Sequence, residues 1–178
     1  TTAGTVTLSG ANSYSGATTI IAGTLALGAN DALPDSTSVT VTGGDLDLAT
    51  FTDTVTSLRL ENDGNRVSGD AANVLTLSST GDALTFHAGA DITDSDVHFI
   101  LSGASGGNVV ASNADDGTAS GIAASIDLGG LSRTFSVANV NSGGSDLGTD
   151  GVISNGGVIK TGVGTLKYAA DNTYTGLT

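Results

Sequence analysis

Hydrophobic and polar residues alternate along this chain in short runs. Clear examples are Thr5-Val6-Thr7-Leu8, Val39-Thr40-Val41-Thr42 and Asp45-Leu46-Asp47-Leu48. Alternation with a period of two predicts β-strands that bury one face. No stretch of ten residues combines helical apolar spacing with capping signals, so the pattern predicts an all-β chain. Comparable runs continue at residues 58–60, 75–77, 84–86, 97–99, 126–128, 133–137 and 164–166.

The two ends of the chain repeat each other. Gly4-Thr5-Val6-Thr7-Leu8 aligns with Gly164-Thr165-Leu166-Lys167-Tyr168, and Asn12-Ser13-Tyr14-Ser15-Gly16 aligns with Asn172-Thr173-Tyr174-Thr175-Gly176. Both alignments share one offset, so that Gly4 falls on Gly164 and Asn12 falls on Asn172 without a gap. A repeat on a long period is typical of stacked arrays, in which each unit packs against the next. We therefore interpret the chain as a section of an array, and we expect the pattern to continue beyond both ends.

Many short strands fit either a sandwich or barrel, or a β-solenoid. The solenoid is favoured because the strands are short for a sandwich, the repeat is long, and turns as small as Ala22-Gly23 separate strands. We predict a single continuous β-helix over residues 1–178, with coils of roughly 20–25 residues and about three short strands per coil. The residues expected to stack inward as ladders are Leu25, Leu27, Val39, Val41, Leu46, Leu48, Leu58 and Leu60.

Composition and charge exclude several classes of protein. The chain has 27 Gly, 4% aromatic residues and no Trp, so small aliphatic side chains must fill a narrow core. The net charge of −13, with only five Lys and Arg, excludes a basic patch for nucleic acid or for anionic lipid. The lack of Cys excludes a disulfide scaffold, a thiolate zinc site and thiol catalysis. No apolar run is long enough to predict a membrane span.

The terminal segments resemble a known family motif. The C-terminal copy, residues 157–178, reads Gly157-Val158-Ile159-Lys160-Thr161-Gly162-Val163-Gly164-Thr165-Leu166-Lys167-Tyr168 and continues through Asn172-Thr173-Tyr174-Thr175-Gly176-Leu177-Thr178. The N-terminal copy, residues 4–27, keeps the same elements and ends in Gly23-Thr24-Leu25-Ala26-Leu27. Both copies resemble the autotransporter-associated β-strand repeat of type V secretion passenger domains. The middle of the chain, residues 61–150, matches only in general β-helical character.

The resemblance carries expectations about fold, location and partners. It implies a right-handed parallel β-helix that is secreted through an outer-membrane β-barrel translocator and folds outside a Gram-negative cell, at its surface. It also implies flanking β-helical repeats of the same chain as partners. We expect no nucleic-acid partner and no insertion of this segment into the membrane.

The densest cluster of reactive side chains is formed by His87, Asp91, Asp94, Asp96 and His98. One interpretation is a metal site or an acid/base pair on the outer wall. The alternative is that the histidines face water and the aspartates form a turn, where Asp side chains bond to nearby backbone. We favour the turn, because acidic turns recur along this chain.

Other motifs admit a chemical interpretation that we do not adopt. Asn113-Ala114-Asp115-Asp116-Gly117 is similar to the acidic pairs of β-helical polysaccharide hydrolases, but no basic companions follow it. Gly143-Gly144-Ser145-Asp146 with Asp150-Gly151 echoes a calcium-binding nonapeptide only once and incompletely. The three Thr-Val-Thr runs would form an ice-binding array only if they shared one flat face; these runs are Thr5-Val6-Thr7, Thr40-Val41-Thr42 and Thr54-Val55-Thr56.

Two residue types recur at equivalent places in both copies. Tyr14 and Tyr174 are interpreted as aromatic rings packed over a turn, with carbohydrate stacking as the alternative. Asn12 and Asn172 are interpreted as turn or ladder residues. We assign no catalytic, cofactor-binding or metal-ligating residue.

These observations predict a structural, non-enzymatic protein without a cofactor. The expected role is a stiff β-helical stalk in an adhesin that assists export and surface display. The alternative is a polysaccharide-binding or polysaccharide-cleaving β-helix whose site lies within residues 61–150. Adhesion through a protein receptor is a third hypothesis, which the residues do not separate from the first.

Overall fold

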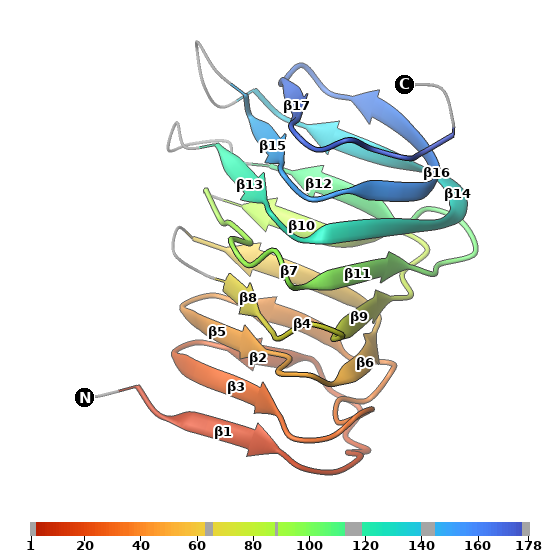
Figure 1. The fold of residues 1–178 in the computed structure, drawn as a ribbon. Helices are drawn as coiled ribbons and strands as arrows, with labels where there is room; N and C mark the ends of the chain where they lie inside the picture. The colour runs from red at the N-terminus through yellow and green to blue at the C-terminus, as the bar shows by residue number, and fades with distance from the viewer. Residues whose placement is uncertain (1–2, 63–65, 88, 113–118, 140–144, 176–178) are drawn as a thin grey trace.

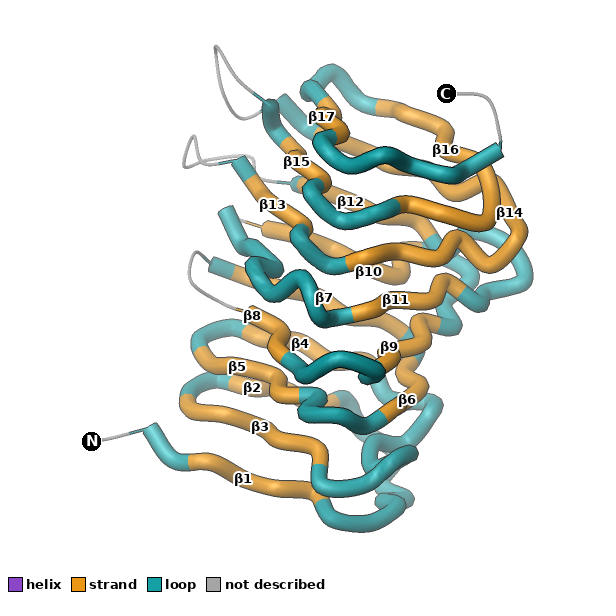
Figure 2. Tube along the Cα trace, in the orientation of Figure 1, coloured by secondary structure: helices purple, strands orange, loops and turns teal. Residues whose placement is uncertain are grey.

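Each coil of the molecule places its strands in parallel with those of the coils before and after it. The computed structural model describes residues 3–62, 66–87, 89–112, 119–139 and 145–175; within them every strand pair is parallel and no helix occurs. The coils stack into a β-solenoid with β1 near one end of the stack and β17 near the other (Figures 1 and 2). The predicted all-β solenoid fold is confirmed.

Three faces run along the solenoid. The first face holds a four-stranded sheet and, further along, a three-stranded sheet. The four strands are β1 (Thr5–Leu8), β3 (Gly23–Leu27), β5 (Gly44–Asp47) and β8 (Arg66–Ser68), and the three are β13 (Ser120–Ile122), β15 (Leu147–Thr149) and β17 (Leu166–Tyr168). Figure 1 shows both sheets on the same side of the stack.

The second and third faces are joined by two long strands that turn the corner between them. The second face contains β6 (Thr52–Val55), β9 (Val74–Leu77), β11 (His98–Leu101) and the first parts of β14 (Ser125–Val137) and β16 (Ile153–Thr161). The third face contains β2 (Thr18–Ile20), β4 (Ser38–Val41), β7 (Ser57–Glu61), β10 (Asp82–His87), β12 (Asn108–Ala111) and the remaining parts of β14 and β16.

The alternating runs at 126–128 and 133–137 predict two strands, but the structure has one bent strand, β14. Gly129 and Gly130 adopt φ of 66° and 77°, a region that favours glycine, and this lets the backbone turn without leaving the ladder. Ser125 therefore pairs with His98 on the second face, and Phe135 pairs with Val109 on the third.

The register of the pairs gives the length of each coil, and this length varies along the stack. Thr5 pairs with Thr24 in a short coil, whereas His98 pairs with Ser125 in a longer one. The shortest coils are therefore shorter, and the longest coils longer, than the predicted length of roughly 20–25 residues. Pairing constrains the strands, whereas the connections between them can vary in length. Residues 44–61 contain one strand on each face, β5, β6 and β7, in agreement with about three strands per coil.

A single apolar cluster runs through the stack from Ile20 to Val158. The predicted ladder residues Leu46, Leu58 and Leu60 are fully buried, whereas Leu25 at the N-terminal end is half-buried. Burying each such leucine contributes about 1.5–3 kcal/mol. The core of the described chain is thus long and thin, as the small aliphatic composition predicts.

Candidate functional site

The predicted acidic cluster forms a turn whose carboxylates bind backbone. Asp94 accepts hydrogen bonds from the N–H groups of Asp96 (2.9 Å) and Gly69 (3.1 Å), and Asp91 accepts one from Gly121 N–H. These bonds tie residues 91–96 to the coils on either side. Among the described residues, no group of three or more His, Asp or Glu side chains is placed to hold a metal ion. The geometry agrees with the turn interpretation.

The two histidines of the same cluster lie on different faces. His87 ends β10 on the third face, and His98 begins β11 on the second. The His98 Nδ1 atom lies 2.5 Å from Ser125 Oγ on the next coil, so this ring makes a contact between coils. The structure does not bring the two rings together into one site.

The threonine runs do not share a face. Thr5-Val6-Thr7 belongs to β1 on the first face, Thr40 to β4 on the third, and Thr54 to β6 on the second. These runs therefore do not form the flat array that ice binding needs.

The acidic motif at residues 113–117 and the calcium-like motif at residues 143–151 fall wholly or partly outside the described residues. Residues 113–117 lie outside the described part of the chain, as do Gly143 and Gly144. Asp146 is buried, and its carboxylate accepts the N–H of Thr165 (2.6 Å) on the following coil. Asp150 is exposed. The visible part of the Gly143–Asp146 motif thus bonds to backbone.

The repeated asparagines make the same local bond in both copies. The Nδ2 group of Asn12 donates to Gly10 O (2.8 Å), and that of Asn172 donates to Ala170 O (3.0 Å). Each side chain also reaches a neighbouring coil: Asn12 Nδ2 donates to Ala32 O (2.7 Å), and Asn172 Oδ1 accepts from Ile153 N–H (2.7 Å). The predicted turn and ladder role is confirmed.

The repeated tyrosines differ in their surroundings. The Tyr14 hydroxyl lies 2.6 Å from Thr18 Oγ1, and its ring is 39% exposed. The Tyr174 ring packs against Tyr168 with centroids 5.8 Å apart. Burial raises the pKa of Tyr168 to about 12, and the nearby Tyr174 adds to this shift. The Tyr174 ring is therefore packed, as predicted for that copy, but its aromatic partner is Tyr168 at the end of β17.

A buried arginine is the main polar feature that the sequence analysis missed. Arg133 is 1% exposed, and burial lowers its pKa. The guanidinium donates to the carbonyls of Leu101 (2.5 Å) and of Gly103, Gly106 and Leu128 (each 2.9 Å). It fastens the corner of β14 to the loop after β11. The signal was present, because Arg133 alternates in phase with the inward Phe135 and Val137.

Asp53 is a second buried charge that was missed. Its carboxylate accepts the N–H groups of Leu33 (2.9 Å) on the preceding coil and of Thr54 (2.8 Å). Burial raises the pKa of Asp53, although these backbone donors lower it, and nearby Asp31 raises it further. Asp53 alternates in phase with the buried Val55, which is the signal that could have revealed it.

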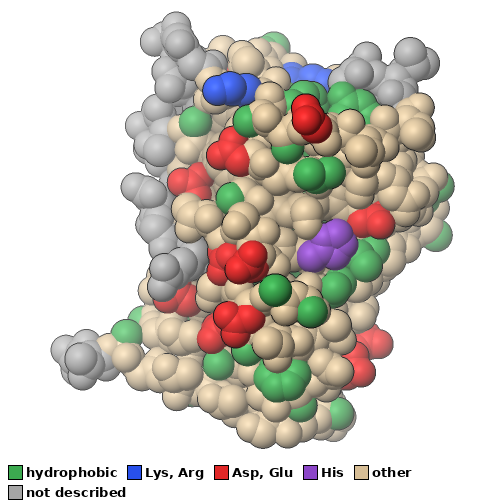
Figure 3. Space-filling view, in the orientation of Figure 1, with side chains coloured by type: hydrophobic (Ala, Val, Ile, Leu, Met, Phe, Trp, Pro, Cys, Tyr) green, Lys and Arg blue, Asp and Glu red, His purple; other side chains and the backbone are tan. Residues whose placement is uncertain are grey.

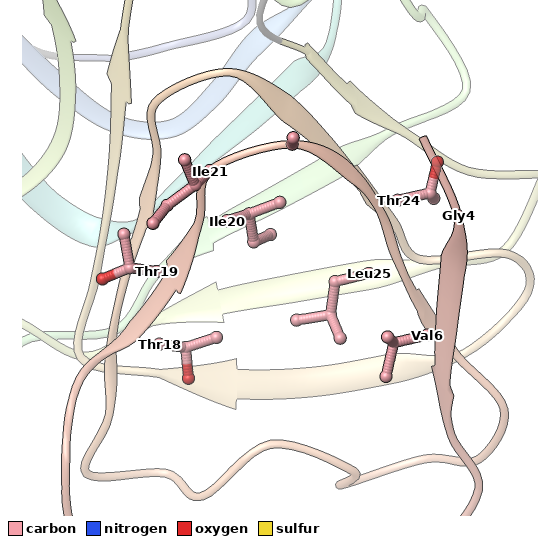
Figure 4. Close-up of a pocket in the computed structure, with 9 residues that line it drawn as sticks. Gly4, Val6, Thr18, Thr19, Ile20, Ile21, Thr24 and Leu25 are labelled. Carbon is pink, nitrogen blue, oxygen red and sulfur yellow. The ribbon is translucent and has the colours of Figure 1, made fainter. Parts of the chain in front are cut away.

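The described surface has recesses, of which a pair bears on function. One, of about 220 Å³, lies at the N-terminal end among β1, β2 and β3, where Val6, Ile20 and Leu25 converge (Figure 4). The other, of about 270 Å³, lies on the first face beside the bridge between Ile92 and Ile122. Its polar lining comes from Asp91, Thr93 and Asp150. The first recess is mainly apolar, whereas the second offers oxygen acceptors.

Charge is spread unevenly over the surface. Figure 3 shows acidic side chains scattered over one face and basic side chains near the end that carries β17. One ion pair occurs among the described side chains, between Arg59 and Glu61 at 2.5 Å.

In the described part of the chain no helix is both long and apolar enough to span a membrane.

Comparison with known proteins gives one family and one curated relative. Residues 3–27 and 158–178 match the passenger-associated-transport-repeat family. The first segment contains β1, β2 and β3, and the described part of the second contains the end of β16 and β17. The chain is similar to the adhesin BmaC autotransporter of Brucella suis biovar 1 (strain 1330), with 29% identity over 99% of this chain. The chain spans 4% of the length of that relative. No solved structure matches the chain.

Proposed function

From the premise that the chain carries two copies of the autotransporter passenger repeat, we propose that it is a β-helical stalk segment of an adhesin-like passenger. The observation that carries this is that the described parts of both copies stack in one parallel solenoid and pack against the same apolar cluster. The repeat and the adhesin relative support a location outside a Gram-negative cell, at its surface.

The stack has the properties of a stiff spacer. Each described coil pairs in parallel with its neighbours, and the apolar ladder continues from coil to coil. Stability in such arrays is nearly a sum of coil and interface contributions, so added coils lengthen the rod without changing its width. This architecture supports the part of the proposal that assigns the chain a structural role.

We further propose that the repeat copies assist export. A coil that has folded outside the cell offers an open strand edge on which the next coil can form, and this opposes return of the chain through the translocator. Flanking repeats and the outer-membrane β-barrel are the partners in this proposal. The absence of Cys is consistent with passage through a narrow pore.

Surface display tests the export proposal. The chain is placed between a reporter and an outer-membrane translocator, and residues 158–178 are replaced by a Gly/Ser linker of equal length. We expect less reporter at the cell surface, measured as the fraction cleaved by added protease. Equal replacement of residues 66–86, which lie outside both repeat copies, is the control for the loss of folded coil alone. Unchanged display with the linker in place of 158–178 would contradict the proposal.

A glycan-binding function is the alternative, favoured by the acceptor-lined recess on the first face. Asp91, Thr93 and Asp150 could accept hydrogen bonds from sugar hydroxyls there. Titration with neutral and anionic glycans, monitored by the amide signals of residues 91–93 and 121–123, tests it. Binding that Asp150→Asn abolishes would support it, and the absence of binding and of cleavage products would remove it.

A further inference from the structure

The bend of β16 contains the one Asn–Gly dipeptide of the sequence, Asn155–Gly156. Asn155 is exposed at the corner between the second and third faces, where its side chain bonds to the preceding coil. We propose that Asn155 is a site of spontaneous deamidation, which converts its amide to a carboxylate and removes this bond between two coils. This chemistry is independent of the stalk and export functions proposed above.

The geometry of the bend calls for both residues of the dipeptide. Pairing with β14 passes from Ser154 to Gly156 and skips Asn155, which adopts a φ of 53°, a region that Asn tolerates better than most residues. Gly156 has a φ of 153°, and a Cβ there would lie 2.3 Å from the carbonyl oxygen of Leu131. A side chain therefore does not fit after Asn155, and the pair that makes the bend is also the labile pair.

The reaction needs only this dipeptide and water. The backbone nitrogen of Gly156 attacks Cγ of Asn155 and gives its proton to water, a new C–N bond closes a succinimide ring, and the Cγ–Nδ2 bond breaks. Nδ2 takes up a proton and leaves as ammonia. Water then adds to either carbonyl of the ring and leaves aspartate or isoaspartate, so that one water is consumed for each ammonia released.

The identity of the following residue distinguishes Asn155 from other asparagines of the chain. Glycine has no side chain to shield the attacking nitrogen. Asn73, Asn108 and Asn172 each precede a β-branched residue, which hinders that attack. Asn73 is also only 1% exposed, whereas water reaches the exposed Asn155. We therefore expect the reaction to be fastest at Asn155.

The bond that deamidation removes joins Asn155 to β14. Asn155 Nδ2 donates to Asp127 Oδ1 (2.8 Å), and the same oxygen accepts the N–H of Gly129 (2.7 Å). After deamidation a second carboxylate faces Asp127 in place of a donor, and like charges at this separation repel each other. The isoaspartate product also lengthens the backbone at the bend. Both products weaken the corner between β14 and β16.

Peptide mapping by mass spectrometry tests the reaction on the folded chain. The chain is incubated at neutral pH in water enriched in heavy oxygen, which labels each newly formed carboxyl group. We expect conversion at Asn155 to be several times faster than at Asn172, with both aspartate and isoaspartate formed. Asn155→Gln is the matched control, because it keeps an amide but needs a larger ring. Conversion at Asn155 that is absent, or no faster than at Asn172, overturns the proposal.

A charge exchange tests the consequence for the corner. We expect Asn155→Asp to lower the urea midpoint of unfolding. Asp127→Asn combined with Asn155→Asp should restore it, because the amide at position 127 can then donate to the carboxylate at position 155 while its oxygen still accepts Gly129 N–H. An unchanged midpoint in Asn155→Asp, or a double variant no more stable than that single variant, would show that the corner does not depend on this bond.

Discussion

At the scale of single residues, Arg133 shows how this fold uses a buried charge. Its guanidinium is held by four backbone carbonyls from two coils. The planar fork of Arg suits this arrangement, since its N–H groups diverge in fixed directions. Removing the side chain would leave these buried carbonyls without their donors.

We predict that Arg133→Met lowers the free energy of unfolding by about 3 kcal/mol or more, because unsatisfied buried acceptors and a lost charged hydrogen-bond network both destabilise. Urea unfolding followed by circular dichroism measures it. Arg59→Met is the control: Arg59 is 43% exposed and pairs with Glu61, so the loss should stay below about 1 kcal/mol. Similar losses in the two variants would contradict the prediction.

Asp53 yields a prediction about pH. Its pKa in the folded chain is raised above the ordinary 3.8, so the folded state binds the proton more tightly than the unfolded state does. Protonation therefore stabilises the fold. This contribution is complete below the ordinary value and is lost as the pH rises through the raised pKa.

The Asn side chain does not titrate, so Asp53→Asn should not lose stability through deprotonation at this position. We therefore expect the variant to gain stability relative to the natural chain as the pH rises from about 3 to about 7. The Asn side chain can still accept Leu33 N–H through Oδ1. Urea unfolding at several pH values for both chains measures the difference. The exposed Asp35→Asn serves as control, and a natural chain that gains stability over Asp53→Asn with rising pH would refute the prediction.

At the scale of elements, the bend of β14 depends on two adjacent glycines with different surroundings. A Cβ on Gly129 would lie 2.2 Å from the carbonyl oxygen of Leu101, whereas a Cβ on Gly130 would meet its nearest atom, Asn155 Oδ1, at 4.0 Å. Both residues have positive φ. Only Gly129 of this pair therefore combines the backbone conformation with a close approach to another coil.

Gly130→Ala should cost about 1–2 kcal/mol, the usual penalty for a side chain in the left-handed region. Gly129→Ala should cost clearly more, because the backbone of β11 or β14 must also move. Thermal and urea unfolding of the two variants measure both losses. Equal losses would show that the contact with Leu101 does not restrain the corner.

At the scale of the whole molecule, the net charge of −13 opposes compaction. Acidic side chains are scattered over the described surface, and one ion pair offsets them there. Repulsion between exposed charges is screened as ionic strength rises, with a Debye length that falls from about 30 Å at 0.01 M to about 8 Å at 0.15 M. The folded state should gain from this screening more than the expanded chain does.

We therefore predict that the melting temperature rises when NaCl is increased from about 0.01 M to about 0.15 M. Scanning calorimetry at constant pH measures the shift. Sucrose at the same osmolarity is the control for effects unrelated to charge. A melting temperature that falls, or that does not change, would show that self-repulsion is negligible in this fold.

Local patterns along the chain were enough to predict its fold class, its repeat and many of its strands. Alternation predicted β1, β4 and β7 and the inward positions of Leu46, Leu58 and Leu60, because side chains alternate strictly between the two faces of a strand. The alignment of Gly4 with Gly164 predicted the stacked array. Each of these inferences uses information that lies within a few residues or in a recurring motif.

Contacts between coils could be decided only by the tertiary structure. The register that brings Arg133 onto Leu101, Asp53 onto Leu33 and Asn172 onto Ile153 depends on coil lengths that vary along the stack. The bend of β14 and the placement of the three threonine runs on three faces have the same origin. The sequence by itself determined which side chains point inward, since that follows from local periodicity. Which of them meet was decided by the stacking of coils, because the partner lies about one full coil away and local pattern carries no information about that distance.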